Sequence, residues 1–586
     1  MAGLVARFAF KDPVLADRVF FFTLVLGGLP IAARTTWGMV RGRFAADIVA
    51  MLAIVGAVVF REYFAGTVIV LMQSGGEALE AYAMRRATAS LEALLERAPR
   101  VARRLVDGRL EDVAVETVRP GDTLVVRPGD LIPVDAAVIA GTSAVDQSAV
   151  TGEPLPIRAV PGTELLSGSV NRDGALTVRA LRASDQSQYQ QIVELVARAR
   201  REKPPIQRVA DRFAVWFTPL TLALCAVAYL VTRQPASILA VLVVATPCPL
   251  ILAVPVAVIA AISKAAAAGV IVKSGAAIEQ LGLARVVVFD KTGTLTLGRP
   301  TVSAIVPANG RSADELLGIA AAVEQLSAHH LGQAVAEAAR QRGLALPPAT
   351  DVRETPGLGV AGRVPGHSVA VGSTAYLAGR GITVAAGAAD RTTAFIAIDD
   401  RYAGCITFAD HLRHQVPALL RRLADLGIQE TVMLTGDRRE SAELIAAEAG
   451  IPIVRANLLP ADKVGAVHEL KRRWGERGVV MVGDGINDAP ALAAATVGIA
   501  MGEHGPAASA EAADVVLLVD DIWHVAEAIA ISRRMRRIIM QSLGIGLGVS
   551  LLLMVIAATG RISPSVGAVL QEGLDAAVIL NALRAR

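Results

Sequence analysis

An aspartate followed by lysine, threonine and glycine stands directly after an apolar run that is typical of a buried strand. The run covers residues 286–289, and Asp290-Lys291-Thr292-Gly293-Thr294 follows it. A carboxylate in this position is free to attack, and the hydroxyl, amide and glycine groups beside it can surround a phosphoryl group. The pattern therefore predicts a site at which the Asp290 carboxylate meets a phosphoryl group.

Two further strand-like runs, at 431–434 and 479–482, also end in turns that carry acids. Thr435-Gly436-Asp437 follows the first run, and Asp484-Gly485-Ile486-Asn487-Asp488 follows the second. Because parallel strands bring their carboxyl ends to one edge of a sheet, we expect these turns to lie beside Asp290. The added carboxylates and amide suit Mg²⁺, and Thr435, Asp437 and Lys463 can complete a phosphate cradle.

The composition is that of a membrane protein with soluble domains. Of 586 residues, 53% are hydrophobic and 19% charged, which excludes a disordered, fibrous or nucleic-acid-coating chain. The net charge of +4, from 58 basic and 54 acidic residues, is too small to indicate a polyanionic partner. Three scattered cysteines make no disulfide framework, so we expect a reducing compartment for the soluble part.

Seven apolar segments are candidates to cross the roughly 30 Å of hydrocarbon in a bilayer. They are residues 14–33, 45–60, 63–81, 213–231, 238–262, 538–560 and 562–582. Arginines and lysines flank them on one side, so the positive-inside rule places residues 84–205 and 264–535 in the cytoplasm. We expect a multi-pass protein of the cell membrane whose catalytic domains are cytoplasmic.

The two cytoplasmic blocks have different patterns. An amphipathic, arginine-rich stretch at 77–106 is expected to be helical, and short alternating runs at 113–118, 123–126, 134–139 and 175–178 predict a small β domain. The second block predicts an α/β domain into which residues 301–402 are inserted. The expected domains are 1–83, 206–263 and 536–586 in the membrane, 84–205, 264–300 with 403–535, and 301–402.

Four motifs together resemble the signature set of the P-type ion-motive ATPases, over nearly the whole chain. They are Asp290–Thr296, Thr435–Asp437, Gly483–Pro490 and Thr151-Gly152-Glu153. The resemblance implies a multidomain membrane protein with an α-helical transmembrane bundle of about seven helices. It also implies a small β actuator domain and a haloacid-dehalogenase-like α/β phosphorylation domain that carries an inserted α+β nucleotide-binding domain.

The same resemblance assigns roles to individual residues. ATP would phosphorylate Asp290, Mg²⁺ would be bound by Asp290, the Thr292 carbonyl and Asp484 with Asp488 in support, and Glu153 would position the hydrolytic water. The implied catalytic set is completed by Lys291, Thr435, Gly436, Asp437, Lys463 and Asn487.

The inserted segment resembles the nucleotide domain of the heavy-metal-transporting branch. Glu324 and Ser327-Ala328-His329-His330 resemble its adenine-binding element, and Gly357-Leu358-Gly359 resembles its glycine pair. His330 stands where that branch has proline, and Gly372-Ser373 stands where it has Gly-Asn. We therefore expect the affinity for ATP to differ from that of the branch.

Thr246-Pro247-Cys248-Pro249 interrupts the fifth apolar segment, and its prolines should break the helical hydrogen bonds and free carbonyls. Such a break is tolerated at an ion site. The last segment adds Gln571, Glu572 and Asp575, with Glu572 and Asp575 spaced to share one helical face.

One thiolate with oxygen ligands suits Ni²⁺, Co²⁺, Fe²⁺ or Zn²⁺ better than Cu(I). The chain resembles the variant subgroup with Thr-Pro-Cys, for which nickel or iron export is implied.

Alternatives remain open at the sequence level. Cu(I) export by the same mechanism is one, and a membrane-anchored phosphatase or metal sensor without transport is another; the thiol disfavours an alkali-cation or proton pump.

The family usually has eight membrane helices, so the first is expected to be absent, and no Gly-Met-Thr-Cys-x-x-Cys motif occurs. Expected partners are the lipid bilayer, ATP and a divalent metal ion, without nucleic acid. The sequence indicates no oligomeric state.

Overall fold

The computed structural model describes residues 12–40, 47–96, 101–106, 108–147, 156–187, 205–245, 248–298, 300–327, 329–355, 358–384, 393–484, 488–501 and 512–586. The chain divides into two compact units. The first comprises Met1–Leu283, Leu517–Val519 and Glu527–Arg586, and the second comprises Ala284–Val516 and Asp520–Ala526.

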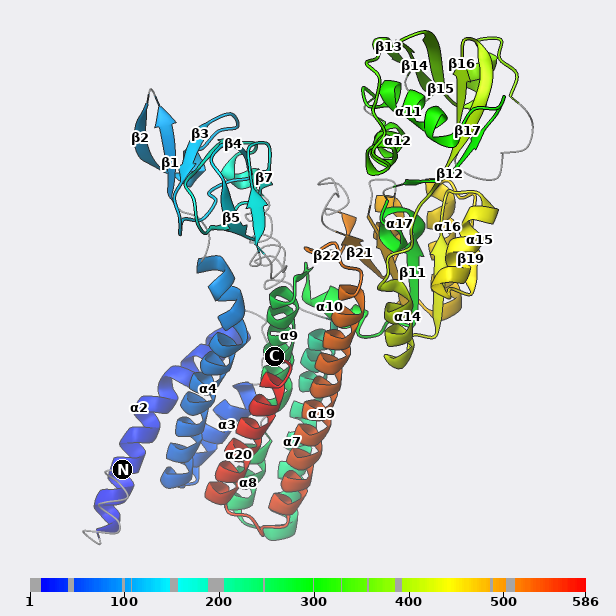
Figure 1. Cartoon of the computed structure of the whole chain (residues 1–586). Coiled ribbons are helices and arrows are strands. Elements are labelled where there is room, and N and C mark those ends of the chain that lie inside the picture. The colour runs from blue at the N-terminus through cyan, green and yellow to red at the C-terminus, as the bar shows by residue number, and fades with distance from the viewer. Residues whose placement is uncertain are drawn as a thin grey trace. The chain divides into compact units, whose positions relative to one another are not determined.

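Apolar helices of 10 to 35 residues form a bundle in the first unit (Figure 1). They are α2 (Pro13–Val40), α3 (Asp47–Val59), α4 (Tyr63–Glu96), α7 (Pro205–Thr232), α8 (Pro235–Val244), α9 (Cys248–Ala267), α19 (His524–Ala558) and α20 (Pro564–Leu583). Helix α4 packs against α2, α9 and α20, and α20 also packs against α8. Leu26, Leu71 and Val569 point outward and are 74%, 70% and 65% exposed. Apolar side chains on the outside suit a bundle whose solvent is lipid.

Three helices within the described residues are long and apolar enough to cross a membrane. They are Pro13–Trp37, His524–Ala558 and Pro564–Leu583. The shorter apolar helices Ile48–Val59, Phe217–Thr232, Pro235–Val244 and Ala253–Ala267 lie in three other predicted segments, and the segment at 63–81 is the first part of α4. The predicted count of seven spans is therefore not confirmed by length and composition.

The predicted interruption of the fifth segment is present. Helix α8 ends at Val244, and α9 begins at Cys248. The N–H of Ala245 donates to the Val241 carbonyl at 3.0 Å, but Ala245 itself, with φ −81° and ψ 39°, is no longer helical. Thr246 and Pro247 themselves lie outside the described residues.

A small β domain follows α4. Its larger sheet has the order β2-β1-β3-β9-β4-β7, and its smaller sheet has the order β6-β5-β8. The strands are β1 (Val101–Val106), β2 (Arg109–Ala114), β3 (Thr123–Val126), β4 (Ala136–Ala140), β5 (Ser143–Asp146), β6 (Ile157–Ala159), β7 (Glu164–Leu165), β8 (Val170–Asn171) and β9 (Leu176–Ala180). Leu124, Val134, Leu165 and Val178 contribute to one apolar core.

The helix predicted for residues 77–106 is too long. Helix α4 ends at Glu96, and residues 101–106 form β1, which pairs antiparallel with β2 from Val101↔Ala114 to Val106↔Arg109. Gly108 in the connection has φ +77°, a conformation that favours glycine and permits a tight turn. The hairpin hydrogen bonds thus override the helical appearance of this arginine-rich stretch. The predicted strand at 113–118 is also displaced, because β2 ends at Ala114 and a short 3₁₀ turn follows at Val115–Thr117.

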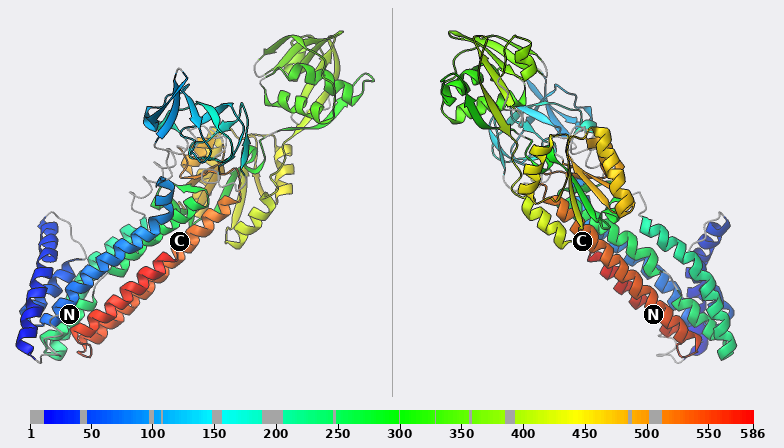
Figure 2. Two further views of the ribbon diagram at one scale, coloured as in Figure 1. Left: turned by 60° about the vertical axis from the view of Figure 1, so that its left-hand side comes forward. Right: turned by 90° about the vertical axis from the view of Figure 1, so that its right-hand side faces the viewer.

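The second unit contains the predicted α/β domain. Its strands follow the order β22-β21-β20-β11-β18-β19, and β11 is parallel to both of its neighbours, β18 and β20. These strands are β11 (Val286–Asp290), β18 (Glu430–Leu434), β19 (Ile453–Arg455), β20 (Val479–Gly483), β21 (Val497–Met501) and β22 (Val515–Leu517). Helices α14 (Val416–Asp425), α15 (Arg439–Ala449), α16 (Pro460–Trp474) and α17 (Ala489–Ala494) flank this sheet (Figure 2). The three predicted strands before the acidic turns are therefore confirmed and adjacent.

An antiparallel domain is inserted between β11 and β18. Its sheet has the order β12-β17-β16-β15-β14-β13, so the first and last inserted strands pair and both ends of the insertion lie together. The strands are β12 (Thr301–Pro307), β13 (Thr350–Thr355), β14 (Gly359–Val364), β15 (His367–Gly372), β16 (Thr393–Ile398) and β17 (Arg401–Ala409). Helices α11 (Ala313–Glu324) and α12 (His330–Gln341) contribute Leu316, Val323 and Val335 to its core, and α13 (Thr374–Ala378) follows β15.

Candidate active site

The carboxyl edge of the parallel sheet carries a buried lysine between two acids. Asp290 is the last residue of β11 and is 5% exposed. Lys463 Nζ, on the first turns of α16, donates to Asp290 Oδ1 at 2.5 Å and to Asp488 Oδ1 at 2.7 Å. Residues that are far apart in the chain thus meet where β11 and β20 end, as the parallel arrangement predicts.

A third acid lies in the same place. Asp290, Asp484 and Asp488 each offer a carboxylate oxygen, and these oxygens all lie within 4.8 Å of one another. Burial, followed by the charge of Asp488, raises the pKa of Asp290 although Lys463 opposes the shift. Burial and Asp488 also raise the pKa of Asp484, to about 6. One ammonium cannot balance three carboxylates, and hard oxygen donors at this spacing fit Mg²⁺.

The loop after Asp290 is held against the same acids. Gly293 has φ +73°, and a Cβ at this position would collide with the carboxylate of Asp484. A glycine is therefore required both for the backbone conformation and for the close approach. The buried Lys291 forms an ion pair with Asp437, whose N–H donates to Thr435 Oγ1 at 3.1 Å. The structure thus brings together the Asp290, Thr435–Asp437 and Asp484 motifs.

Sequence reasoning missed three residues that support this loop. Asp410 accepts a hydrogen bond from Thr296 Oγ1 at 2.5 Å, and the side chain of Arg413 contacts both the loop and Asp520. Asp410 and Arg413 follow β17, at the point where the chain returns from the insertion. No sequence pattern distinguishes this buried arginine from the many solvated ones.

The residues that the sequence predicts to bind adenine contact one another in the inserted domain. Glu324 ends α11 and is 8% exposed, and its carbonyl accepts from the Ser327 N–H at 2.9 Å. The His329 N–H donates to Ser327 Oγ at 3.1 Å, and His329 Nδ1 accepts from the N–H of Leu331 at 3.2 Å, which caps α12. Gly332 lies so close to Glu324 that a Cβ there would meet its carboxylate.

Glu354 is an acid of this element that the sequence did not reveal. Ser327 Oγ donates to Glu354 Oε2 at 3.1 Å. Burial, and then the negative charge of Glu354, raise the pKa of Glu324 to about 7. Gly359 begins β14 and pairs with Gly372 of β15, where either Cβ would collide with backbone atoms. A close approach of two strands therefore explains both glycines.

Polar side chains lie between α19 and α20 in the bundle. Ser550 Oγ donates to Gln571 Oε1 at 3.3 Å, and Gln571 Nε2 donates to Asp575 Oδ1 at 3.0 Å. Gln571 is fully buried and Asp575 is 6% exposed. Glu572 is half-buried, and its carboxylate lies beside Gly75 of α4. Ser550 was not predicted as part of this group, because serine is common on helices of every kind.

Several predicted site residues cannot be placed. Glu153, Gly357 and Asn487 lie outside the described residues, as do Thr246 and Pro247. Cys248 is the first residue of α9, but its side chain is also outside the described part. Thr292 is exposed on the loop. The roles assigned to all of these residues stay predictions.

Two family models match the chain. Residues 284–496 match the haloacid dehalogenase-like hydrolases, and residues 96–197 match the P-type ATPase actuator domain. The first range contains the parallel sheet and its insertion, and the second contains the small β domain.

Curated relatives align with most of the chain. The probable cobalt/nickel-exporting P-type ATPase of Mycolicibacterium smegmatis is 37% identical over 100% of this chain and 91% of its own length. The copper-transporting ATPase 1 of Rhizobium meliloti is 38% identical over 89% of this chain, and the aligned region covers 66% of that protein's own length. The cadmium, zinc and cobalt-transporting ATPase of Bacillus subtilis is 34% identical over 96% of this chain and 81% of its own length.

Solved structures are similar over the whole chain. A crystal structure of a zinc-transporting PIB-type ATPase in its E2.Pi state superposes with a TM-score of 0.64 at 33% identity, covering 99% of this chain and 96% of that one. A second crystal structure of a zinc-transporting PIB-type ATPase, in another state, gives a TM-score of 0.59 at 33% identity, covering 99% and 97%.

Glu324→Gln is expected to remove a pH dependence from the stability of the inserted domain. Between pH 4.5 and about 7, Glu324 keeps its proton when folded and loses it when unfolded, so the free energy of unfolding falls as the pH rises. Over this pH range the free energy of unfolding should fall by about 3 kcal/mol in the native protein. Glutamine does not titrate, so the variant should not show this fall. Hydrogen exchange of the α11 amides in the full chain, corrected for the pH dependence of the intrinsic exchange rate, measures this free energy at each pH.

The matched control is Glu337→Gln, at a side chain on α12 that is 55% exposed. It should leave the slope as in the native protein. Equal slopes for the native protein and Glu324→Gln would contradict the prediction.

Proposed function

The chain belongs to the heavy-metal-transporting branch of the P-type ATPases, and from this we propose that it uses ATP to export a divalent transition-metal ion from the cytoplasm. P-type ATPases hydrolyse ATP with Mg²⁺ and move ions across membranes. The observation that carries the proposal for this chain is the contact of Lys463 with both Asp290 and Asp488, beside Asp484. Such a group is suited to accept a phosphoryl group and to compensate its charge.

In the proposed reaction, an oxygen of the Asp290 carboxylate attacks the γ-phosphorus of ATP. The bond from that phosphorus to the bridging oxygen breaks, ADP leaves with the electron pair, and an aspartyl phosphate remains. The Lys463 ammonium, together with Lys291 and the Thr435–Asp437 turn, offsets and orients phosphate charge. Bound Mg²⁺ would be held by Asp290, Asp484, Asp488 and the Thr292 carbonyl, and would neutralise charge on the phosphoryl oxygens.

The second half of the reaction restores Asp290. Water attacks the aspartyl phosphate, the phosphorus–carboxylate bond breaks, and inorganic phosphate leaves. We assign the positioning of this water to Glu153 of the actuator domain and support of the acidic turn to Asn487. Residues 84–205 are proposed as the actuator domain, 264–300 with 403–535 as the phosphorylation domain, and 301–402 as the nucleotide-binding domain.

ATP is proposed to bind through Glu324, His329, Gly357 and Gly359. The support is the contact series from the buried Glu324 and Ser327 to the exposed His329 in the inserted domain. Glu354 adds a negative charge to this corner, and His330 and Ser373 depart from the residues that the branch usually has. These differences support an altered affinity for ATP.

The transported metal is proposed to bind Cys248, Gln571, Glu572 and Asp575, in the subgroup defined by Thr246-Pro247-Cys248. The support is the interruption between α8 and α9 together with the buried Gln571–Asp575 contact. One soft sulfur among several oxygens favours Ni²⁺, Co²⁺, Fe²⁺ or Zn²⁺ over Cu(I). The relatives carry names for copper as well as for cobalt, nickel, cadmium and zinc, and Cu(I) is the second candidate for this reason.

We place the protein in the cell membrane as a multi-pass chain with its soluble domains in the cytoplasm. The metal enters from the cytoplasm while Asp290 is free, and phosphorylation closes this access and opens the outer one. A membrane-anchored phosphatase without transport would share the Asp290 chemistry, but it would have no use for a buried polar group between α19 and α20.

Asp290→Asn is expected to abolish phosphoenzyme and transport, with a loss of more than about three orders of magnitude. A carboxamide is not a competent nucleophile, so no acyl phosphate can form at this position. Acid-quenched labelling from radioactive ATP in membranes measures the intermediate, and hydroxylamine should remove the label from the native protein. The exposed Asp314 provides the control Asp314→Asn. Hydroxylamine-resistant label, or label retained by Asp290→Asn, would show that the phosphorylated residue is a different one.

Cys248→Ala and Asp575→Asn are expected to reduce metal stimulation of ATP hydrolysis at least about tenfold, because each loses one proposed ligand of the metal. Purified protein would be assayed under reducing conditions with Ni²⁺, Co²⁺, Fe²⁺, Zn²⁺ and Cu(I) in turn. Cys225→Ala is the matched control, since Cys225 is packed in the apolar core of the bundle. Strongest stimulation by Cu(I) would overturn the divalent assignment, and hydrolysis insensitive to every metal would favour the phosphatase.

A further inference from the structure

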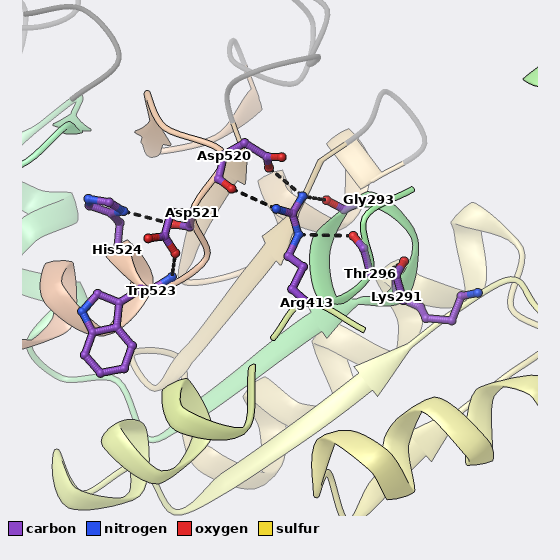
Figure 3. Close-up of polar contacts among 8 residues, drawn as sticks. All are labelled: Lys291, Gly293, Thr296, Arg413, Asp520, Asp521, Trp523 and His524. Carbon is purple, nitrogen blue, oxygen red and sulfur yellow. Dashed lines mark hydrogen bonds and ion pairs between the residues drawn. The ribbon is translucent and has the colours of Figure 1, made fainter. Parts of the chain in front are cut away.

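Arg413 is a buried cation whose side chain binds two separate backbone segments. It is 5% exposed. Its Nε donates to the Thr296 carbonyl at 3.2 Å, and its Nη2 donates to the Gly293 carbonyl at 3.0 Å. On the other side, Nη1 donates to the carbonyl of Asp520 at 2.9 Å and Nη2 donates to Asp520 Oδ1 at 2.6 Å (Figure 3). One planar guanidinium therefore joins the loop after Asp290 to the backbone at Asp520.

The loop side of this contact is attached directly to the phosphorylation residue. Gly293 is three residues after Asp290, and its backbone is pressed against the Asp484 carboxylate. Thr296 is held in turn by Asp410 and by the Lys291 carbonyl. Arg413 also donates its own N–H to the Leu295 carbonyl at 2.9 Å. A shift of the loop backbone would therefore displace the guanidinium.

The other side of the contact leads into a long helix. Asp520 stands four residues before His524, where α19 begins, and α19 continues without interruption to Ala558. Asp521 Oδ1 accepts from the Trp523 N–H at 2.9 Å, and the Asp521 carbonyl lies 3.1 Å from His524 Nδ1. The segment between Asp520 and the helix is thus itself held by hydrogen bonds. Farther along α19, Ser550 donates to Gln571 of α20.

We propose that Arg413 and Asp520 form a coupling contact, which makes the state of the Asp290 loop and the position of the α19 start depend on each other. The guanidinium binds carbonyls on both segments, so neither segment moves alone without leaving a buried donor or acceptor unpaired. The Arg413 side chain contacts Gly293, Thr296 and Asp520 rather than the carboxylates proposed to hold metal or accept phosphate, so we treat it as a positioning residue. The role rests on the proposed function, because it presupposes a cycle in which phosphorylation and metal binding influence each other.

The alternative is that Arg413 only stabilises the fold. Removing one partner of a buried ion pair is destabilising in either case, so loss of activity alone would not distinguish the two roles. The distinguishing quantity is the effect of metal on phosphorylation. In a coupled pump, metal bound in the membrane suppresses phosphorylation of Asp290 by inorganic phosphate, and an uncoupled variant should still be phosphorylated but should ignore the metal.

The experiment uses the full-length protein in membranes, labelled with radioactive inorganic phosphate and Mg²⁺. The titrant is the divalent ion, among Ni²⁺, Co²⁺, Fe²⁺ and Zn²⁺, that stimulates native ATP hydrolysis most. In the native protein, saturating metal should reduce the label at least about tenfold. In Asp520→Ala, the label without metal should stay within about twofold of native, and saturating metal should reduce it less than about threefold.

Two variants separate coupling from general loosening of the helix start. Asp520→Asn keeps an oxygen that can accept from Arg413, and its suppression by metal should lie between those of native protein and Asp520→Ala. Asp521→Ala removes the hydrogen bond to Trp523 while leaving the Arg413 contacts, and it should be suppressed as strongly as native.

Suppression of Asp520→Ala with native extent and midpoint would overturn the proposal, as would equal loss of suppression in Asp521→Ala. If Asp520→Ala takes up no phosphate, Asp520→Asn decides: partial suppression supports coupling, and native suppression assigns the contact to stability alone. If the native protein itself takes up no label, or ignores metal, it is the proposed transport function that fails.

Discussion

The carboxyl edge of the parallel sheet in the second unit carries an excess of buried negative charge, and this excess determines what can bind there. Asp290, Asp484 and Asp488 converge there, and Lys463 supplies one ammonium. Burial alone would lower the pKa of Lys463, but the carboxylates outweigh it and raise this pKa, so the lysine stays charged. Its single charge still leaves the carboxylates uncompensated, and a buried anion is costly without a partner. Binding of a cation at this edge would therefore be stabilising.

The surrounding structure keeps these like charges from separating. The parallel neighbours β11 and β20 hold the acids side by side, and α16 carries Lys463. Gly293 admits the Asp484 carboxylate where any Cβ would exclude it. A comparable restraint occurs in the bundle, where Gln571 lies between Ser550 and Asp575 and satisfies the buried acid from a neighbouring turn of α20. Polar groups at low dielectric are tolerated when each is hydrogen-bonded, and such groups mark the sites at which a ligand can replace a protein partner.

Much of this arrangement could be predicted from sequence because it depends on local rules. Strand-like runs before Asp290, Thr435 and Asp484 predict one parallel edge, and two prolines around Cys248 predict the gap between α8 and α9. Residues 101–106 were wrongly predicted to be helical, since only pairing with β2 shows that they form a strand. Arg413, Glu354 and Ser550 were missed for a related reason. Their importance lies in partners distant along the chain, and an arginine that is buried looks the same in sequence as one that is solvated.

The length of α19 explains why a contact at its beginning matters for residues far along it. A helix of 35 residues rises about 1.5 Å per residue, and its internal hydrogen bonds make it far stiffer than a loop. A displacement at Asp520 therefore moves the helix as a whole instead of being absorbed by backbone rotations. This requires that the short segment between Asp520 and His524 is itself restrained. Asp521 restrains it through Trp523 and His524. Since the guanidinium of Arg413 contacts the loop beside Asp290 as well as Asp520, it links the acidic edge of the sheet to the segment from which α19 begins.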